Sequence, residues 1–250
     1  MTTQQKQDYL RAFRKFQKAR EVYYKPKIKA LLTKQALQVV HKEVVTFEPI
    51  YTLLLSLYKD VAKVWGHQSH LSIRRQVAKS RQPIGFSERL YNILKDQYGI
   101  DLLKDAMNIT QTTKDIIQKI LTDAAITGIG IDDIVKEITD NDFPEVRARR
   151  IARTETVAAA NIAGDIIAKE SGLEMNKEWL AILDQRTRPD HYAIHGTIIE
   201  QDLKFDVNGN PMRFPGDRGT DGIDTPPGET INCRCVAVYI PKRDAHGRLL

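Results

Sequence analysis

The sequence predicts an α+β protein, in which a mainly helical N-terminal region is joined to a small β-containing C-terminal domain. Apolar residues recur at helical spacing up to Gly172, and short apolar runs separated by Gly, Pro and Asp follow it. A length of 250 residues allows one large domain or two smaller ones with a proper core. We predict a basic helical region over residues 1–110, a second domain over residues 111–240 and a mobile tail over residues 241–250.

Two amphipathic helices are predicted in the first third of the chain. The first carries an aromatic stripe at helical spacing, formed by Tyr9, Phe13, Phe16 and Tyr23. Pro26 is expected to end or bend this helix, because proline lacks the N–H that a helix interior needs. The second helix is expected to close at Gly66. Its apolar stripe is formed by Ile50, Leu54, Leu57, Val61 and Val64.

Shorter helices separated by turn residues are predicted next. The segment SERLYNILKDQYG predicts a helix that stops at Gly99, and TTKDIIQKILTDAAITG predicts another that ends before the turn GIG. The segment IDDIVKEITD predicts a short helix over residues 131–140. The spacings GxGxxG and GxxxxGK[ST] are both missing from the sequence, so a nucleotide phosphate loop has no support.

The longest helix is predicted over residues 144–171 and links the two regions. Pro144 suits its first turn and Gly172 its C-terminal stop. Small residues such as Ala160 and Gly164 permit the close approach of another backbone. A polar stripe at spacings of three and four residues is expected to reach into another part of the molecule. It is formed by Arg147, Arg150, Thr154, Asn161 and Asp165.

Strands are predicted within residues 176–240. The segments EWLAIL and CVAVYI have the composition of strands, and LKFDVNGNPMRF predicts a hairpin around Asn208-Gly209, a pair suited to positive φ angles. The segment PGDRGTDGIDTPPGET is a long loop, and loops of this length usually serve a function or an interaction.

Basic residues are concentrated in the first third of the chain. Residues 1–81 contain 17 Lys and Arg against 5 Asp and Glu, whereas residues 82–250 contain 21 against 27. Two explanations stay open: a surface for a polyanion or an acidic partner, or a helix bundle with Lys and Arg on its wet faces. The candidate contacts to DNA or a partner are Arg11, Arg14, Lys15, Lys18, Lys25, Lys27 and Lys29.

Polar side chains gather in the stretch LDQRTRPDHYAIHG. His191 and His195 are four residues apart and would share one side of a helical turn, whereas Cys233 and Cys235 would share one face of a strand. Two His and two Cys are donors suited to Zn²⁺. The alternative is a packed cluster in which Asp184 pairs with an arginine and the thiols are small buried groups. We predict the packed cluster and no bound cofactor, with zinc as the alternative.

A metal-dependent phosphodiesterase or nuclease is the alternative from another functional class. It would use His191, His195 and the two cysteines, with Asp184 to activate water and arginines to hold a phosphate. Because the sequence shows no second carboxylate or histidine cluster to complete such a site, we predict that the chain is not an enzyme.

The composition also bears on location. No apolar run approaches the roughly 20 residues that span a bilayer, and the N-terminus lacks the apolar core of a signal peptide. With 2 cysteines only two positions apart, the chain has no disulfide framework. We therefore predict synthesis in a reducing cytoplasm and no membrane partner.

Five motifs follow one another over roughly residues 115–240. They are RxxRIARTETxxAxNxA, KEW, DQRTRPDHYAIHG, the hairpin FDVNGNPMRFPGD and NCRC. In this order they resemble the phage Mu F-like minor head proteins, a family of tailed-phage head morphogenesis proteins. The matching positions are Arg153, Thr154, Glu155, Asn161, Trp179, Asp184, Arg186, His191, Gly196, Pro215, Gly216, Asp217, Asn232, Cys233 and Cys235.

The resemblance implies a low-copy virion component, made in the host cytoplasm. It would associate with the portal and other head proteins during assembly, and lie inside the capsid near the portal and the packaged DNA. Some family members carry appended toxin or enzyme domains, but this chain ends ten residues after its last predicted strand, so we expect no such domain here. We expect the polar residues to form a structural cluster rather than a catalytic site. Its members are Arg153, Thr154, Glu155, Asn161, Asp184, Arg186, Arg188 and His191.

Overall fold

The computed structural model describes residues 1–77, 86–140, 143–220 and 223–250. The helices are α1 (Thr3–Val40), α2 (Glu48–Val61), the π-helical turn η1 (Ala62–Gly66), α3 (His67–Gln76), α4 (Phe86–Thr127), α5 (Ile131–Asp140), α6 (Phe143–Glu170), α7 (Pro189–Ala193) and α8 (Pro227–Thr230). The strands are β1 (Met175–Leu180), β2 (Ile198–Glu200), β3 (Phe205–Val207), β4 (Asn210–Met212), β5 (Gly219–Thr220), β6 (Ile223–Asp224) and β7 (Val236–Pro241). Long helices come first and the strands follow, which confirms the predicted α+β class.

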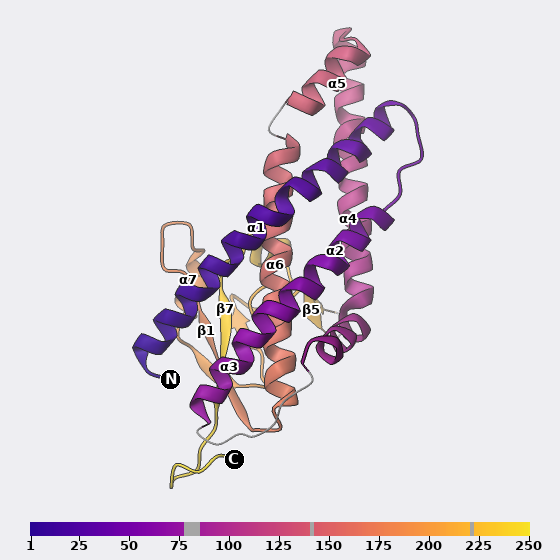
Figure 1. Ribbon diagram of the computed structural model, residues 1–250. Coiled ribbons are helices and arrows are strands. Elements are labelled where there is room, and N and C mark those ends of the chain that lie inside the picture. Colours follow the sequence, from indigo (N-terminus) through magenta and orange to yellow (C-terminus); the bar gives the residue numbers. More distant parts are fainter. Residues whose placement is uncertain (78–85, 141–142, 221–222) are drawn as a thin grey trace.

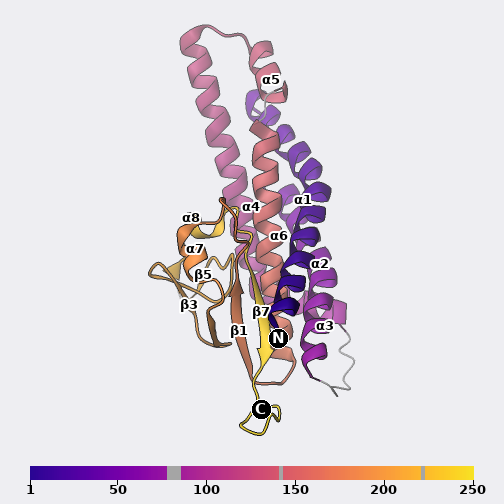
Figure 2. The ribbon, with the colours of Figure 1, turned by 90° about the vertical axis from the view of Figure 1, so that its left-hand side faces the viewer.

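Helix α6 lies at the centre of the molecule. In Figure 2, α1, α2 and α3 lie on one side of α6, and β1 and β7 lie on the other. Every residue from Thr154 to Ala168 is buried. A helix that is buried all round must let its neighbours approach closely, which explains the run Ala158, Ala159 and Ala160. The linking helix predicted over residues 144–171 is thus the axis around which both halves of the chain pack.

The main sheet has three antiparallel strands in the order β2–β1–β7. In its register Trp179 faces Ala237 and Leu180 faces Val236. Strands β3 and β4 form a separate hairpin, as the sequence predicts, and its turn residues Asn208 and Gly209 have φ angles of 53° and 79°. Strands β5 and β6 form a second short ladder in the long Gly/Pro loop.

One apolar core extends from α1 to β7. It includes Phe13 on α1, Trp65 on η1 and Trp179 on β1, all at most 1% exposed. A smaller cluster joins the end of α1 to α4 and α5, at the top of Figure 1. Helix α4 runs without a break through residues 110 and 111, where the sequence predicts a boundary between two regions. The helical region and the strands therefore share one core instead of folding as separate bodies.

Three predicted helix ends are not ends in the structure. Helix α1 continues through Pro26, helix α4 continues through Gly99, and Gly66 lies in a π-helical turn that leads directly into α3. Packing explains the first case, because Tyr24 and Ile28 on either side of Pro26 are buried in the core. Most helical stability in proteins comes from such tertiary packing, so an unfavourable residue need not end the helix.

The C-terminal tail, predicted to be mobile, is hydrogen bonded to the body of the protein. Arg243 pairs with Leu249 in a β-bridge, and the N–H of Glu174 donates to the carbonyl of Leu250 (3.2 Å). The guanidinium of Arg243 also donates to the carbonyl of Gln76 (2.7 Å), so the tail contacts both α3 and the segment before β1. Within the described ranges, none of the helices is long and apolar enough to cross a membrane.

Candidate functional site

The polar face of α6 binds the backbone of the segment that contains both cysteines. The hydroxyl of Thr154 accepts a hydrogen bond from the N–H of Asn232 (3.0 Å). The side chain of Asn161 accepts from the N–H of Ala237 (2.8 Å) and donates to the carbonyl of Cys235 (3.3 Å). These three bonds satisfy backbone groups that would otherwise be buried without partners, and they fix the position of the segment along α6.

Further along α6, at Gly164, this helix and strand β7 also lie very close together. A Cβ atom at Gly164 would lie 3.3 Å from a ring carbon of Tyr239, so a larger residue would press against β7. The hydroxyl of Tyr239 donates to Asp165 (3.3 Å), and burial raises its pKa well above the usual value. The polar stripe of the linking helix therefore reaches into β7.

His191, Cys233 and Cys235 form a buried cluster. Nδ1 of His191 lies 3.4 Å from Sγ of Cys235 and 3.8 Å from Sγ of Cys233, and the three donor atoms lie within 4.8 Å of one another. The opposite ring nitrogen, Nε2, lies 2.9 Å from Oε2 of Glu229. The ring of Trp179 packs edge-on against the imidazole, with centroids 5.3 Å apart.

Local structure brings the cluster together. Helix α7 begins with a proline in its first turn and ends at Ala193, which places His191 on its buried side. Asn232 adopts a left-handed conformation with φ of 59° between α8 and β7. This turn, in a region that few residue types other than glycine and asparagine visit readily, leads into the two cysteines, both of which are free and buried.

The three side chains of the cluster shift one another's pKa values. A hydrogen bond from Cys235 holds the pKa of Cys233 well below its usual value, and the same contact, with burial, raises the pKa of Cys235 well above it. Burial is the largest influence on the pKa of His191 and lowers it, but the hydrogen bond to Cys233 together with the charges of Cys233 and Glu229 raises the pKa overall.

His195 does not join this cluster. Its Nδ1 atom accepts a hydrogen bond from the N–H of Ala181 (3.0 Å), and burial lowers its pKa. The chain leaves the helical conformation after Ala193, so the two histidines do not share one side of a helical turn. The predicted set of four donors is therefore corrected to three in the described part of the chain.

Asp184 pairs with an arginine, as predicted, but the main partner is Arg234 between the two cysteines. The two side chains form two bonds, of 2.7 and 2.5 Å. This pair holds the pKa of Asp184 well below its usual range. Of the predicted arginines, Arg186 lies 3.5 Å from the Asp184 carboxylate, and Arg188 donates to the carbonyl of Ile231.

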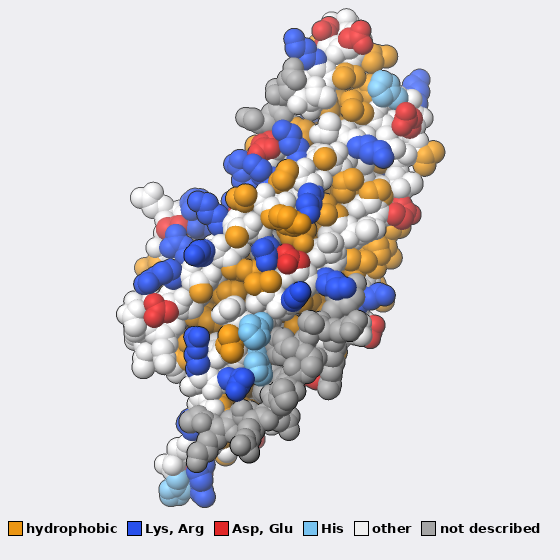
Figure 3. All heavy atoms as spheres, in the orientation of Figure 1, with side chains coloured by type: hydrophobic (Ala, Val, Ile, Leu, Met, Phe, Trp, Pro, Cys, Tyr) orange, Lys and Arg blue, Asp and Glu red, His pale blue; other side chains and the backbone are white. Residues whose placement is uncertain are grey.

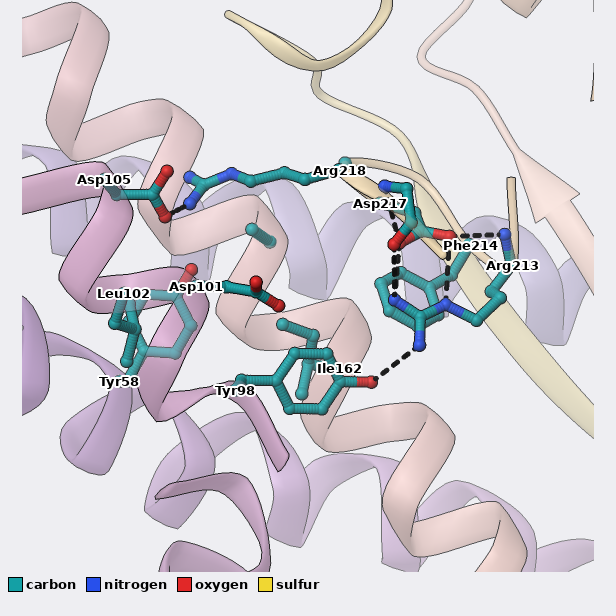
Figure 4. A pocket seen from close by; sticks show the side chains of 13 residues that line it. Tyr58, Tyr98, Asp101, Leu102, Asp105, Ile162, Arg213, Phe214, Asp217 and Arg218 are labelled. Atoms are coloured by element: carbon teal, nitrogen blue, oxygen red, sulfur yellow. Dashed lines mark hydrogen bonds and ion pairs between the residues drawn. The ribbon is translucent and has the colours of Figure 1, made fainter. Parts of the chain in front are cut away.

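Glu155 lies in a second polar group, between α2, α4 and the loop before β5. It accepts hydrogen bonds from Tyr58 (3.1 Å) and Arg218 (2.7 Å), and Arg218 also forms an ion pair with Asp105. Burial raises the pKa of Glu155 to about 7, although the hydroxyl of Tyr58 lowers it. Figure 4 shows Arg218 extending from the loop to Asp105.

The pocket drawn in Figure 4 also contains an ion pair within the loop before β5. Arg213 makes bonds of 3.0 and 2.7 Å to the buried carboxylate of Asp217, and its guanidinium lies 3.5 Å from the hydroxyl of Tyr98 on α4 (Figure 4). These loop arginines attach the C-terminal half of the chain to α4. Arg153, by contrast, points away from this group and forms two bonds of 3.0 Å to Glu21 on α1.

The basic residues predicted to contact DNA or a partner all lie on α1, but they fall into two groups. Lys25 and Lys29 are paired with Glu145 of α6. The other five are exposed, and they are Arg11, Arg14, Lys15, Lys18 and Lys27. Figure 3 shows Lys and Arg side chains along this face of the molecule.

A shallow groove follows the same face of α1. It is lined by Lys15, Lys18, Ala19, Arg20, Val22, Tyr23, Pro26 and Lys27. Lys27 Nζ lies 3.7 Å from the ring centroid of Tyr23, and that ring is about half exposed. Aromatic and basic side chains thus lie together on a surface open to solvent.

Several residues of these groups are not found by the sequence reasoning. Glu229 and Arg218 come from the long Gly/Pro loop, whose conformation the sequence leaves open. Arg234 had a visible signal, because alternation in an extended segment places it on the face opposite the two cysteines.

The fold and the site together define a class of protein: an α+β protein in which a buried helix holds the backbone of a Cys-containing segment and of the strand that follows it. Both cysteines precede β7, whereas the sequence predicts that they lie in a strand. Residues 115–238 match the family model described as Phage Mu protein F like protein. This region, which begins within α4 and ends in β7, therefore belongs to the Mu F-like family.

Curated relatives share part of this region. The chain is 34% identical over 98 residues to the minor head protein GP7 of Bacillus phage SPP1, which covers 38% of this chain and 30% of that protein. It is 31% identical over 109 residues to the NAD(+)--arginine ADP-ribosyltransferase EFV of Enterococcus faecalis, covering 42% of this chain and 21% of that protein. The chain thus spans less than one third of either relative's length. No solved structure matches it significantly.

The second relative corrects one prediction. We predicted that the chain is not an enzyme, but a protein named as an ADP-ribosyltransferase shares 109 aligned residues with it. The family match therefore gives no reason to exclude enzymatic activity. The phosphodiesterase or nuclease alternative is not favoured either, because His195 lies apart from the cluster and Asp184 is bound to Arg234.

Proposed function

We propose that this protein is a minor component of a phage head that acts in head morphogenesis, associates with the portal and other head proteins, and contacts the packaged DNA inside the capsid. The proposal rests on the family match over residues 115–238 and on the likeness to a protein named as a minor head protein. In this role the basic outer face of α1 is the contact surface for DNA.

The exposed face of α1 is the observation that supports a polyanionic partner. Helix α1 contains 10 Lys and Arg against 2 Asp and Glu. In the described ranges, Arg14, Lys15 and Lys18 have no acidic side chain within salt-bridge distance, whereas Lys25 and Lys29 are held by Glu145. Cations on one exposed face attract phosphate without sequence preference.

The arrangement of the core decides how this surface is best tested. Because α1 packs along α6 and contributes Phe13 and Ile28 to the common core, removing it would expose α6. The full chain is therefore the right material, and charge should be removed by substitution.

The DNA contact is tested with the variant Arg14→Gln/Lys15→Gln/Lys18→Gln. Binding to duplex DNA, measured by filter retention over a range of salt, should weaken, and the slope of log affinity against log salt should fall by about 3, since each phosphate contact contributes about 0.9. The matched control removes three exposed lysines of α4, in Lys95→Gln/Lys104→Gln/Lys119→Gln. Equal losses in the two variants, or binding by the native chain that salt does not change, would refute this use of α1.

The portal association is tested by co-expression with the portal protein of the same phage. We expect the two to co-purify and to give heads that contain this chain close to the portal in a cryo-EM map. Assembly of normal heads in which the chain is absent, or is spread over the whole capsid shell, would contradict the proposal.

A further inference from the structure

We propose that His191, Cys233 and Cys235 bind a zinc ion, through Nδ1 of the imidazole and the two thiolates. This inference goes beyond the head-protein function and does not depend on it. It also differs from the metal-free packing that the sequence favours, because the structure brings together one particular imidazole and both sulfur atoms.

The distances fit one face of a tetrahedron. Zinc binds Cys sulfur at about 2.3 Å and His nitrogen at about 2.0–2.1 Å, so ideal tetrahedral angles place a sulfur and a nitrogen ligand roughly 3.6 Å apart. The observed separations from Nδ1 of His191 are 3.4 Å to Cys235 and 3.8 Å to Cys233. Little movement is needed for all three atoms to contact one ion.

The surroundings of the three donors are those of a metal site. In zinc sites the ligating histidine donates its other ring N–H to a carboxylate, a backbone carbonyl or water, which fixes the ring and its tautomer. Here Nε2 of His191 lies 2.9 Å from the Glu229 carboxylate, so Nδ1 is left to face the sulfur atoms. Glu229 comes from α8 and contacts the ring nitrogen opposite the one that faces the sulfur atoms.

A buried donor beside the cluster also lacks a partner. The indole N–H of Trp179 is buried without a hydrogen-bond acceptor, and its ring packs against His191. Buried polar groups without a partner are uncommon in native structures, so this N–H is available to a thiolate sulfur of the cluster.

Zinc is the ion that suits this donor set. Two thiolates and one imidazole are soft and borderline donors that select zinc over magnesium or calcium. The described residues supply three donors, so a water molecule or another small donor would complete the tetrahedron. The ion would join α7 to the segment before β7 and would close the Gly/Pro loop between them.

The test uses the full chain, purified under reducing conditions. Elemental analysis should find one zinc per chain, and replacement by Co²⁺ should give the intense visible absorption and the thiolate charge-transfer bands of tetrahedral sulfur and nitrogen ligation. Removal of zinc by a chelator should lower the melting temperature, because ions that bind only the folded state stabilise it.

Variants then assign the ligands. Cys233→Ala/Cys235→Ala should abolish Co²⁺ absorption. Glu229→Gln keeps all three donors and should weaken zinc affinity about 10–100-fold, measured by competition with a chromophoric chelator. His195→Gln is the matched control, since this histidine lies four residues away and is bonded to a backbone N–H, and its affinity should be unchanged.

Two results would overturn the site. One is a reduced, folded native chain that takes up neither Zn²⁺ nor Co²⁺. The other is metal uptake that survives unchanged in the double cysteine variant. If that variant fails to fold, the thiolate charge-transfer bands of the native chain and the Glu229→Gln affinity decide the question without it.

Discussion

The two sides of α6 are held by different kinds of contact. On the side of α1, α2 and α3 the contacts are mainly apolar, with ion pairs such as Arg153–Glu21 at the edge, and within that layer Trp65 of η1 packs against three aromatic rings of α1 at centroid distances of 5.0–5.2 Å. On the side of β7 they include hydrogen bonds in which the side chains of Thr154 and Asn161 accept from backbone N–H groups. Apolar packing tolerates any side chain of similar volume, whereas a hydrogen bond to a buried N–H needs a particular atom. The motif residues Asn161, Asn232 and Cys235 lie on this second side.

The largest expected effect breaks the apolar side. Phe13 is fully buried against Trp65, and Phe13→Ala should lower the free energy of unfolding by about 3–5 kcal/mol, since the cavity adds to the lost burial. Urea unfolding followed by Trp fluorescence measures this. Phe13→Leu is the control and should retain most of the stability, because it restores volume without the ring. A loss as large in Phe13→Leu as in Phe13→Ala would show that this side is specific too.

A second substitution breaks the polar side. Asn161→Leu preserves volume and adds apolar surface, but it leaves the N–H of Ala237 and the carbonyl of Cys235 without partners. Each unsatisfied buried group costs on the order of 1–3 kcal/mol, so we expect a loss of about 3 kcal/mol in urea unfolding. Ile166→Val on the same helix is the control and should cost about 1 kcal/mol. A neutral Asn161→Leu would remove the distinction between the two sides.

This difference explains which parts of the fold are predictable. The helices and most of the aromatic stripe of α1 follow from apolar spacing, because burial of one face needs only the pattern. Tyr23 is an exception: it is about half exposed, and the neighbouring Tyr24 is buried instead.

The sequence also shows the polar stripe on α6, but it does not show which groups this stripe contacts. Thr154 and Asn161 bind backbone groups of Asn232 and Ala237, and a sequence does not show which backbone group a side chain will reach.

The errors in prediction have the same origin. Pro26 and Gly99 have low helix propensity, but neighbouring side chains on the core side keep α1 and α4 continuous. In the site, the segment from Asp184 to His191 was recognised, whereas Glu229 and Arg218 were missed. Both come from a loop that has no regular spacing to interpret, and only its folded path brings them to His191 and Glu155.

A third prediction concerns charge buried on α6. Because burial raises the pKa of Glu155 from 4.5 to about 7, the folded state binds this proton more tightly than the unfolded state. Stability is therefore greatest below the unfolded pKa and is lost as pH rises through the folded one, by roughly 2 kcal/mol between about pH 5 and pH 7. Urea unfolding of the native chain and of Glu155→Gln over this range measures it. The difference between the two should shrink or reverse as pH rises, and parallel curves would show that Glu155 stays ionised throughout.

The smallest expected effect tests whether ion pairs matter on the apolar side. Arg153 makes two bonds of 3.0 Å to Glu21, and both side chains are about four-fifths buried, at 22% and 17% exposed. A fully exposed pair contributes little, but two parallel bonds with partial burial favour the upper part of that range. We expect Glu21→Gln to cost about 1 kcal/mol, and less at high salt, since salt screens the pair.

Asp8→Asn is the control: it removes the partner of Arg11 at a far more exposed position and should be nearly neutral. A double-mutant cycle with Arg153→Gln isolates the pair. A coupling as large as the cost of Asn161→Leu would mean that α1 is held to α6 by specific polar contacts as well, and that the two sides of this helix differ less than their composition indicates.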